Sequence, residues 1–260
     1  MRLKYLRPRR VLAATVAAVW MSACGGDDKP APASAPPADA KRVDESKTGR
    51  VAGRVVFEGR VPAEPQISMP TDAVCSREIK TGTATETVVT TNGGLENVFV
   101  YIKTGLPTYY FETPREPAKV DQKGCKYLPH VFGVRVGQPI EFTNSDATAH
   151  NVHALGDANQ GFNFTQPMAG MRNTRTFTAR EVMVRLKCDV HPWMTAYAGV
   201  LDHPYYTVTA DSGRFELKNV PAGTYSIEAW HEKLGTQAKE IVVAEKESKE
   251  IDFRFATTVP

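Results

Sequence analysis

Apolar and polar residues alternate with a period of two along much of the chain between Gly49 and Phe255, and turn residues interrupt this pattern often. Such alternation is typical of strands that bury one face. No stretch shows an amphipathic helical pattern longer than two turns. The sequence therefore predicts an all-β fold built of sandwiches. Strand-like segments lie at 50–59, 96–103, 132–144, 174–179, 182–188, 197–202, 213–220, 224–230 and 241–255.

The first 23 residues have the pattern of an export signal. A basic start precedes "VLAATVAAVWM", an apolar run too short to span a bilayer. The following Ser22-Ala23-Cys24 resembles a bacterial lipobox, which implies cleavage before Cys24 and lipidation of that residue. The alternative is an ordinary signal peptide with a chance cysteine. We expect a lipid-anchored protein on the periplasmic face of a bacterial membrane or at the cell surface, and Gly25 favours the outer membrane.

Residues 24–47 are rich in Pro, Ala and charge and contain almost no large apolar side chains. They predict a lipidated, disordered tether. The signal holds five of the 32 basic residues and no acidic one, so its removal leaves 27 basic and 29 acidic residues. The apparent basicity of the whole chain belongs to the signal, and nothing suggests a nucleic-acid partner.

Three cysteines remain in the folded part. Cys75 and Cys125 are candidates for a disulfide, which an oxidising compartment permits, and the alternative is two free thiols. Cys188 is left over. A single thiol in an exported protein needs protection or a role.

The segment "KCDVHPWM" (187–194) places a thiol, an imidazole and a thioether in one loop. In the strand before it, Val182, Val184, Leu186 and Cys188 share one face, so the thiol ends a core-facing row. Pro192 biases His191 away from helical geometry. We therefore expect a tight loop from Cys188 through His191 to Met194.

A second segment, "IEFTNSDATAHNVHA" (140–154), supplies another imidazole. After a turn, His150, Val152 and Ala154 share one face of a short strand, whereas Asn151 and His153 share the other. If Val152 packs in the core, His150 points toward Cys188 and His153 does not.

One thiolate, two imidazoles and a thioether suit a single copper ion that cycles between Cu(I) and Cu(II). The predicted ligands are His150, Cys188, His191 and Met194. Methionine is a poor zinc ligand. The loop lacks the second cysteine of a binuclear copper centre, and the chain lacks the His-x-His pairs of multicopper oxidases. Four protein ligands leave no position open for a substrate, so we expect no enzyme.

These features together with Pro129, Gly137, Asn144 and Asp146 resemble the cupredoxins, most closely those of the amicyanin and plastocyanin type. The resemblance covers 106–204 and implies a Greek-key sandwich. It also implies that Asn151 braces the thiolate loop from the second coordination shell. By the same resemblance His191 would reach the surface as the electron exit beside Trp193, although Trp193 is equally consistent with plain core.

The flanks differ from the middle. The segment 211–230 resembles the carboxypeptidase regulatory-like, or transthyretin-like, β-sandwich, and 49–62 and 95–103 match its early strands loosely. The expected division is therefore 48–105 for N-terminal strands, 106–204 for the cupredoxin domain and 205–260 for regulatory-like strands. Either one sandwich is split by the cupredoxin insertion, or three segments follow in series.

The favoured function is a membrane-tethered periplasmic carrier of one electron with a type 1 (blue) copper site. Its partners would be redox proteins such as a cytochrome, a dehydrogenase or an oxidase. The alternatives are a copper-binding or copper-delivery lipoprotein, and a surface binding lipoprotein in which the cupredoxin domain is structural.

Overall fold

The computed structural model describes residues 40–63, 66–67, 72–79 and 88–257. The predicted signal, Cys24 and most of the predicted tether lie outside these residues. Within them the chain is built of strands, with one four-residue α-helix and two 3-10 turns, η1 (Glu45–Lys47) and η2 (Asp211–Gly213). The predicted all-β class is confirmed. No helix in the described part is long and apolar enough to cross a membrane.

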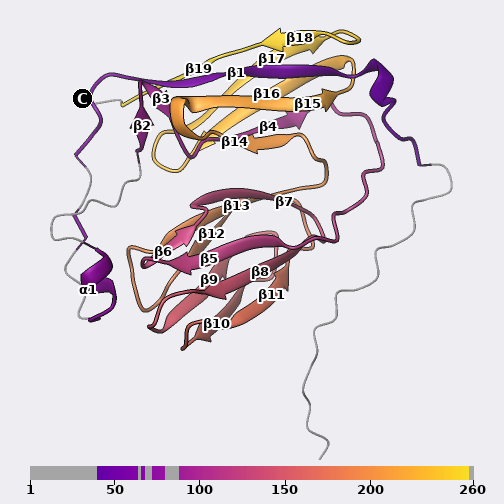
Figure 1. The fold of residues 1–260 in the computed structure, drawn as a ribbon. Helices are drawn as coiled ribbons and strands as arrows, with labels where there is room; N and C mark the ends of the chain where they lie inside the picture. Colours follow the sequence, from indigo (N-terminus) through magenta and orange to yellow (C-terminus); the bar gives the residue numbers. More distant parts are fainter. Residues whose placement is uncertain (1–39, 64–65, 68–71, 80–87, 258–260) are drawn as a thin grey trace, which may run out of the picture. The chain divides into compact units, whose positions relative to one another are not determined.

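Two sheets built from residues 118–201 share one hydrophobic core (Figure 1). We call this unit the first sandwich. Its five-stranded sheet has the order β10-β9-β12-β13-β7 and its four-stranded sheet the order β11-β8-β5-β6. The strands are β5 (Ala118–Lys123), β6 (Lys126–Leu128), β7 (Val131–Arg135), β8 (Pro139–Asn144), β9 (His150–Leu155), β10 (Phe162–Gln166), β11 (Arg172–Thr176), β12 (Glu181–Lys187) and β13 (Thr195–Leu201).

The second sandwich draws its strands from both sides of the first one in the sequence. In its larger sheet, β1 pairs with β3, β15, β18 and β19, and in its smaller sheet β4 lies between β14 and β16. These strands are β1 (Gly49–Glu58), β2 (Thr90–Thr91), β3 (Gly94–Leu95), β4 (Phe99–Thr104), β14 (Tyr206–Val208), β15 (Arg214–Val220), β16 (Gly223–His231), β17 (Gly235–Val243), β18 (Ser248–Glu250) and β19 (Phe253–Ala256).

Three expected boundaries differ from the structure. The segment 132–144 forms two strands in different sheets, because Gly137 turns the chain between them with φ +81°. Leu106 and Phe111 pack against the core of the second sandwich, so the first sandwich begins later than residue 106. The predicted tether also ends earlier than residue 47, since the Tyr110 amide donates to the Lys41 carbonyl at 2.9 Å.

The row of core-facing residues in strand β12 is one residue shorter than alternation predicts. Val184, Leu186 and Cys188 are buried in the core of the first sandwich, as expected. Val182 instead packs against a separate apolar cluster. The cause is a register shift between Glu181 and Val184 in the pairing of β12 with β13, which interrupts the alternation.

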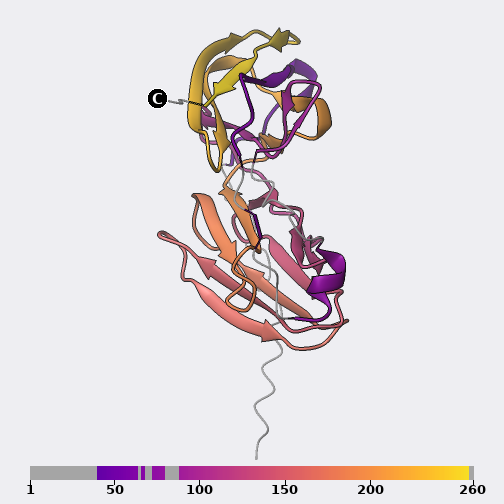
Figure 2. The ribbon, with the colours of Figure 1, turned by 90° about the vertical axis from the view of Figure 1, so that its left-hand side faces the viewer.

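The short helix α1 (Cys75–Glu78) is covalently tied to the first sandwich by a disulfide between Cys75 and Cys125, with a Cα–Cα distance of 5.7 Å. Cys125 lies in the turn between β5 and β6, and both views show α1 beside this end of the first sandwich (Figure 2). Of the two alternatives that the sequence allowed, a disulfide or two free thiols, the structure therefore has the disulfide. It places a segment from the N-terminal part of the chain next to the predicted metal loop.

Candidate metal centre

The loop after β12 turns sharply because its backbone closes on itself. The Cys188 amide donates to the Met194 carbonyl at 3.1 Å, and the Met194 amide donates to the His191 carbonyl at 2.9 Å. The His191 amide lies 3.4 Å from the Cys188 sulfur and donates to it. These bonds hold the thiol, the imidazole and the thioether in one compact turn, as the spacing predicts, with Met194 buried in the core of the first sandwich.

Strand register brings His150 to the same place. Strands β9 and β12 are antiparallel neighbours with Lys187 opposite His153. When this register is continued past Lys187, the start of β9 lies opposite the loop that follows Cys188. His150 is fully buried beside Cys188 and His191, whereas His153 lies on the other face of the strand, where its ring contacts the Asp189 carboxylate at 3.0 Å. The prediction that chose His150 over His153 agrees with this arrangement.

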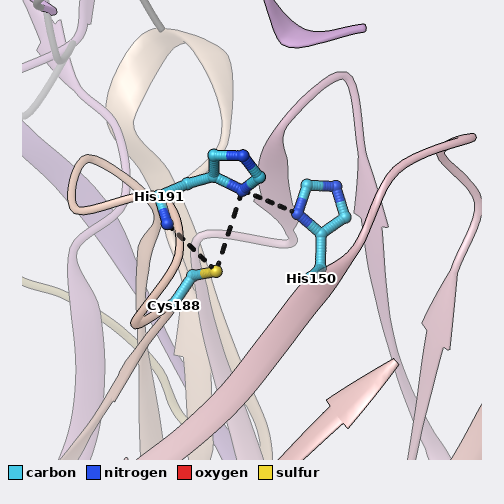
Figure 3. A group of neighbouring side chains, drawn as sticks. All are labelled: His150, Cys188 and His191. Carbon is cyan, nitrogen blue, oxygen red and sulfur yellow. Dashed lines mark hydrogen bonds between the residues drawn. The ribbon is translucent and has the colours of Figure 1, made fainter. Parts of the chain in front are cut away.

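The three donor side chains converge. The Nδ1 atoms of His150 and His191 are 3.1 Å apart, and the Cys188 sulfur is 3.9 Å from His191 Nδ1 (Figure 3). One ligand atom from each of the three residues lies within 4.8 Å of the other two. At most 3% of any of these residues is exposed. A buried group of this kind can hold a metal ion without water among its ligands.

The carboxylate of Asp146 orients His150. Its Oδ2 atom is 2.8 Å from His150 Nε2, and it also accepts the Cys125 amide at 2.8 Å. In the tautomer that donates this bond from Nε2, the Nδ1 lone pair faces Cys188 and His191. This is the form that a metal needs. The sequence pointed to Asp146 only as one of the residues that carry the resemblance, and its position four residues before His150 is the signal that could have found this contact.

Asn151 braces the metal loop from the side. Its Oδ1 atom accepts the Asp189 amide at 3.0 Å, immediately after Cys188, and its amide group donates to the Phe164 carbonyl at 3.0 Å. The Tyr127 hydroxyl donates to the carbonyl of Asn151. The side chain thus links β9, β10 and the loop, which is the bracing role that the resemblance implied.

His191 does not reach the surface, and the expectation of an exposed ring is wrong. The Cys75 sulfur lies 3.6 Å from His191 Nε2, on the side of the ring that faces away from Cys188. Asp72 holds this cover in place by accepting the Val74 and Cys75 amides at 2.7 and 2.9 Å and the Thr148 hydroxyl. Sequence alone offered no sign of this cover, because the contact joins residues 116 apart.

Burial lowers the pKa of His191 below its ordinary value, and the neighbouring His150 lowers it further. The ring is therefore neutral near pH 7, which leaves a nitrogen lone pair for a metal. The Thr148 hydrogen bond in turn lowers the pKa of Asp72, which stays ionised beside the site.

Trp193 is half-buried at the edge of the same core. Its Nε1 donates to the Cys125 carbonyl at 3.1 Å, and its ring centroid is 5.1 Å from that of His191. It therefore packs on the core, as one of the two expectations has it, and its ring also contacts His191.

Two further residues with side chains that can bind metals, His130 and Met168, lie outside the group. His130 contacts the Thr195 carbonyl and the Glu232 carboxylate, and Met168 is exposed. The residues that are present fit copper well. Two imidazoles and a thiol converge among buried side chains, and the one thioether of the loop is buried in the same core.

Comparison with known proteins gives matches to parts of the chain. The family described as "Polysaccharide lyase family 4, domain II" matches residues 184–251, a stretch that runs from β12 to beyond β18. This differs from the regulatory-like family that the flanks resemble. A comparison with curated proteins finds no match.

Similar solved structures include copper proteins. A Cu(I) form of an amicyanin variant is 25% identical, with a TM-score of 0.30, and the match covers 39% of this chain and 97% of that one. A purple cupredoxin from Nitrosopumilus maritimus is 21% identical, with a TM-score of 0.27 and coverages of 32% and 98%. A copper-containing nitrite reductase from Thermus scotoductus SA-01 is 23% identical, with a TM-score of 0.30, and the match spans 39% of this chain but only 26% of the reductase. At these TM-scores the matches carry no weight on function, which rests on the donor set.

Proposed function

We propose that this protein carries single electrons with one type 1 copper ion held by His150, Cys188, His191 and Met194. One observation carries the proposal: one ligand atom from each of His150, Cys188 and His191 lies within 4.8 Å of the other two, and all three residues are buried. A bound copper ion would supply one-electron exchange between its Cu(I) and Cu(II) states.

The chain's own residues would keep the site rigid and dry. Asp146 holds the ring of His150 with its Nδ1 lone pair facing inward, and Asn151 holds the backbone after Cys188. Cys75 covers the outer edge of His191 and excludes water there. A site whose ligands cannot rearrange changes little between the two copper states, which favours rapid electron transfer.

The burial of the three donors argues against copper delivery. A delivery protein passes its ion to an acceptor, whose ligands must reach the metal. Here the exposed fractions of His150, Cys188 and His191 are 0%, 2% and 3%. The arrangement instead suits an ion that stays in place while electrons come and go.

The proposal extends to location and partners. Export, lipidation at Cys24 and a flexible tether would keep the carrier near a bacterial membrane, where redox proteins would be its donor and acceptor. Because the ring of His191 is covered, the half-buried Trp193, 5.1 Å from it between ring centroids, is the aromatic group that would bring electrons to the surface.

The test is the visible spectrum of the full chain after Cu(II) is added. We expect an intense thiolate-to-copper absorption that Cys188→Ser abolishes and that reductant bleaches reversibly. His153→Ala is the matched control, because this histidine lies three residues from His150 and outside the donor group; it should keep the absorption. A folded, copper-loaded chain with Cys188 intact and no such absorption refutes the proposal.

A further inference from the structure

The outer sides of the two histidines face a second group of donors. Cys125, Asp146 and His150 are all buried, and one ligand atom from each lies within 4.8 Å of the other two. This group uses the Nε2 side of His150, which contacts Asp146 at 2.8 Å, whereas the copper group uses Nδ1. The two groups share His150, but Cys188 belongs only to the copper group, so replacing Cys188 removes no donor from the second group.

The disulfide holds a further donor beside this group. Cys75 is bonded to Cys125, with Cα atoms 5.7 Å apart, and its sulfur lies 3.6 Å from His191 Nε2. Two sulfurs on one zinc ion, each about 2.3 Å from the metal, are separated by roughly 3.8 Å. Backbones already this close can present both thiolates to one ion after small side-chain rotations.

We propose that reduction of the Cys75–Cys125 disulfide creates a zinc site with Cys75, Cys125, Asp146 and His150 as ligands. A dithiol reductant gives two electrons and two protons to the two sulfurs and itself becomes a disulfide. Zinc then binds both sulfurs as thiolates and releases their two protons to solvent. Two thiolates, a carboxylate and an imidazole form a closed tetrahedral set that this cation accepts.

The same imidazole serves both sites, and this couples them. The neutral ring of His150 has one nitrogen lone pair. With the proton on Nε2 bonded to Asp146, the lone pair on Nδ1 faces the copper group. When zinc replaces the Nε2 proton, the proton moves to Nδ1 and donates toward His191 Nδ1, 3.1 Å away. Zinc at Nε2 would therefore take the Nδ1 lone pair of His150 away from the copper group.

Cobalt(II) is the probe, because it takes zinc positions and its bond to thiolate absorbs strongly in the near ultraviolet. The protein is the full chain carrying Cys188→Ser, so that no thiolate of the copper group contributes. After reduction by a phosphine and its removal without oxygen, we expect a single Co(II) per chain with an absorption typical of two thiolates and of tetrahedral geometry. The unreduced chain should show none. Asp146→Asn should weaken binding by about tenfold or more.

Two single-thiol chains keep the test decisive if reduction unfolds the protein. Cys75→Ser with Cys188→Ser leaves Cys125 beside Asp146 and His150, and should bind Co(II) with about half the thiolate absorption, since one of the two thiolates remains. Cys125→Ser with Cys188→Ser leaves Cys75 outside the group of three and should bind more weakly. A folded chain without thiolate absorption overturns the proposal. So does binding that Asp146→Asn leaves unchanged, because two free thiols alone would then explain it. None of these outcomes depends on copper binding at the first group.

Discussion

Replacing Cys75 and Cys125 with alanine tests how firmly the N-terminal segment is held over His191. The disulfide joins residues 50 apart, and closing a loop of that length in the unfolded chain corresponds to about 4 kcal/mol of stability at 25 °C. In the variant, Asp72 can still accept the amides of residues 74 and 75 in the folded state. The loss of stability should therefore come mainly from the greater conformational entropy of the unfolded chain. We expect the free energy of unfolding to fall by about this amount.

Urea unfolding, followed by circular dichroism on the copper-free chain, measures this loss. The same variant loaded with Cu(II) should keep its thiolate absorption, because the disulfide contributes no donor to the copper group of His150, Cys188 and His191. It should exchange ligands such as azide or imidazole faster, since the cover of His191 is no longer anchored to Cys125. A loss below about 1 kcal/mol would refute the entropic reasoning. A loss of colour would show that the disulfide shapes the donor group itself.

Three further predictions concern single side chains. His203 is 5% exposed and burial lowers its pKa to about 4, so the unfolded chain binds its proton more readily, and stability is lost as the pH falls from about 6.5 toward 4. His203→Gln should remove about 2–3 kcal/mol of the loss between pH 7 and 4.5, measured by urea unfolding, and an unchanged pH dependence would contradict this. Asp146→Asn removes the charge that orients His150 and should lower Cu(II) affinity about 10–100-fold in a competition with a chelator, against Asp157→Asn as the surface control. Asn151→Ala leaves the Asp189 amide without its acceptor and should cost about 1–3 kcal/mol of stability and shift the copper absorption; an unaltered spectrum would show that the loop needs no brace.

Much of the candidate site follows from local pattern. Side chains alternate along any strand, so burial of Val152 is enough to place His150 toward the core and His153 away from it. The same rule places Cys188 after Val184 and Leu186. It does not hold for Val182, because a register shift with a neighbouring strand interrupts the alternation there. That shift depends on pairing and is invisible in β12 alone.

The contacts around the donors were harder to predict. The bond of Asp146 to His150 spans only four residues and depends on how one turn folds. The Cys75 cover over His191 spans 116 residues, and nothing in "AVCSREI" (73–79) indicates where it packs. The resemblance to small copper carriers predicted that His191 is exposed. That prediction failed because the resemblance covered only residues 106–204 and took no account of the segment around Cys75.

The sequence by itself determined the all-β class, and it predicted that His150, Cys188 and His191, from two separate segments, face one another. These depend on a two-residue period and on the chemistry of sulfur and imidazole, both of which act locally. Only the tertiary structure decided that β1 and β4 pair with strands from the far end of the chain, that Cys75 and Cys125 are bonded, and that His191 is buried beneath them. The physical reason is that burial and pairing between distant segments depend on the packing of the whole chain, which no short stretch of residues specifies.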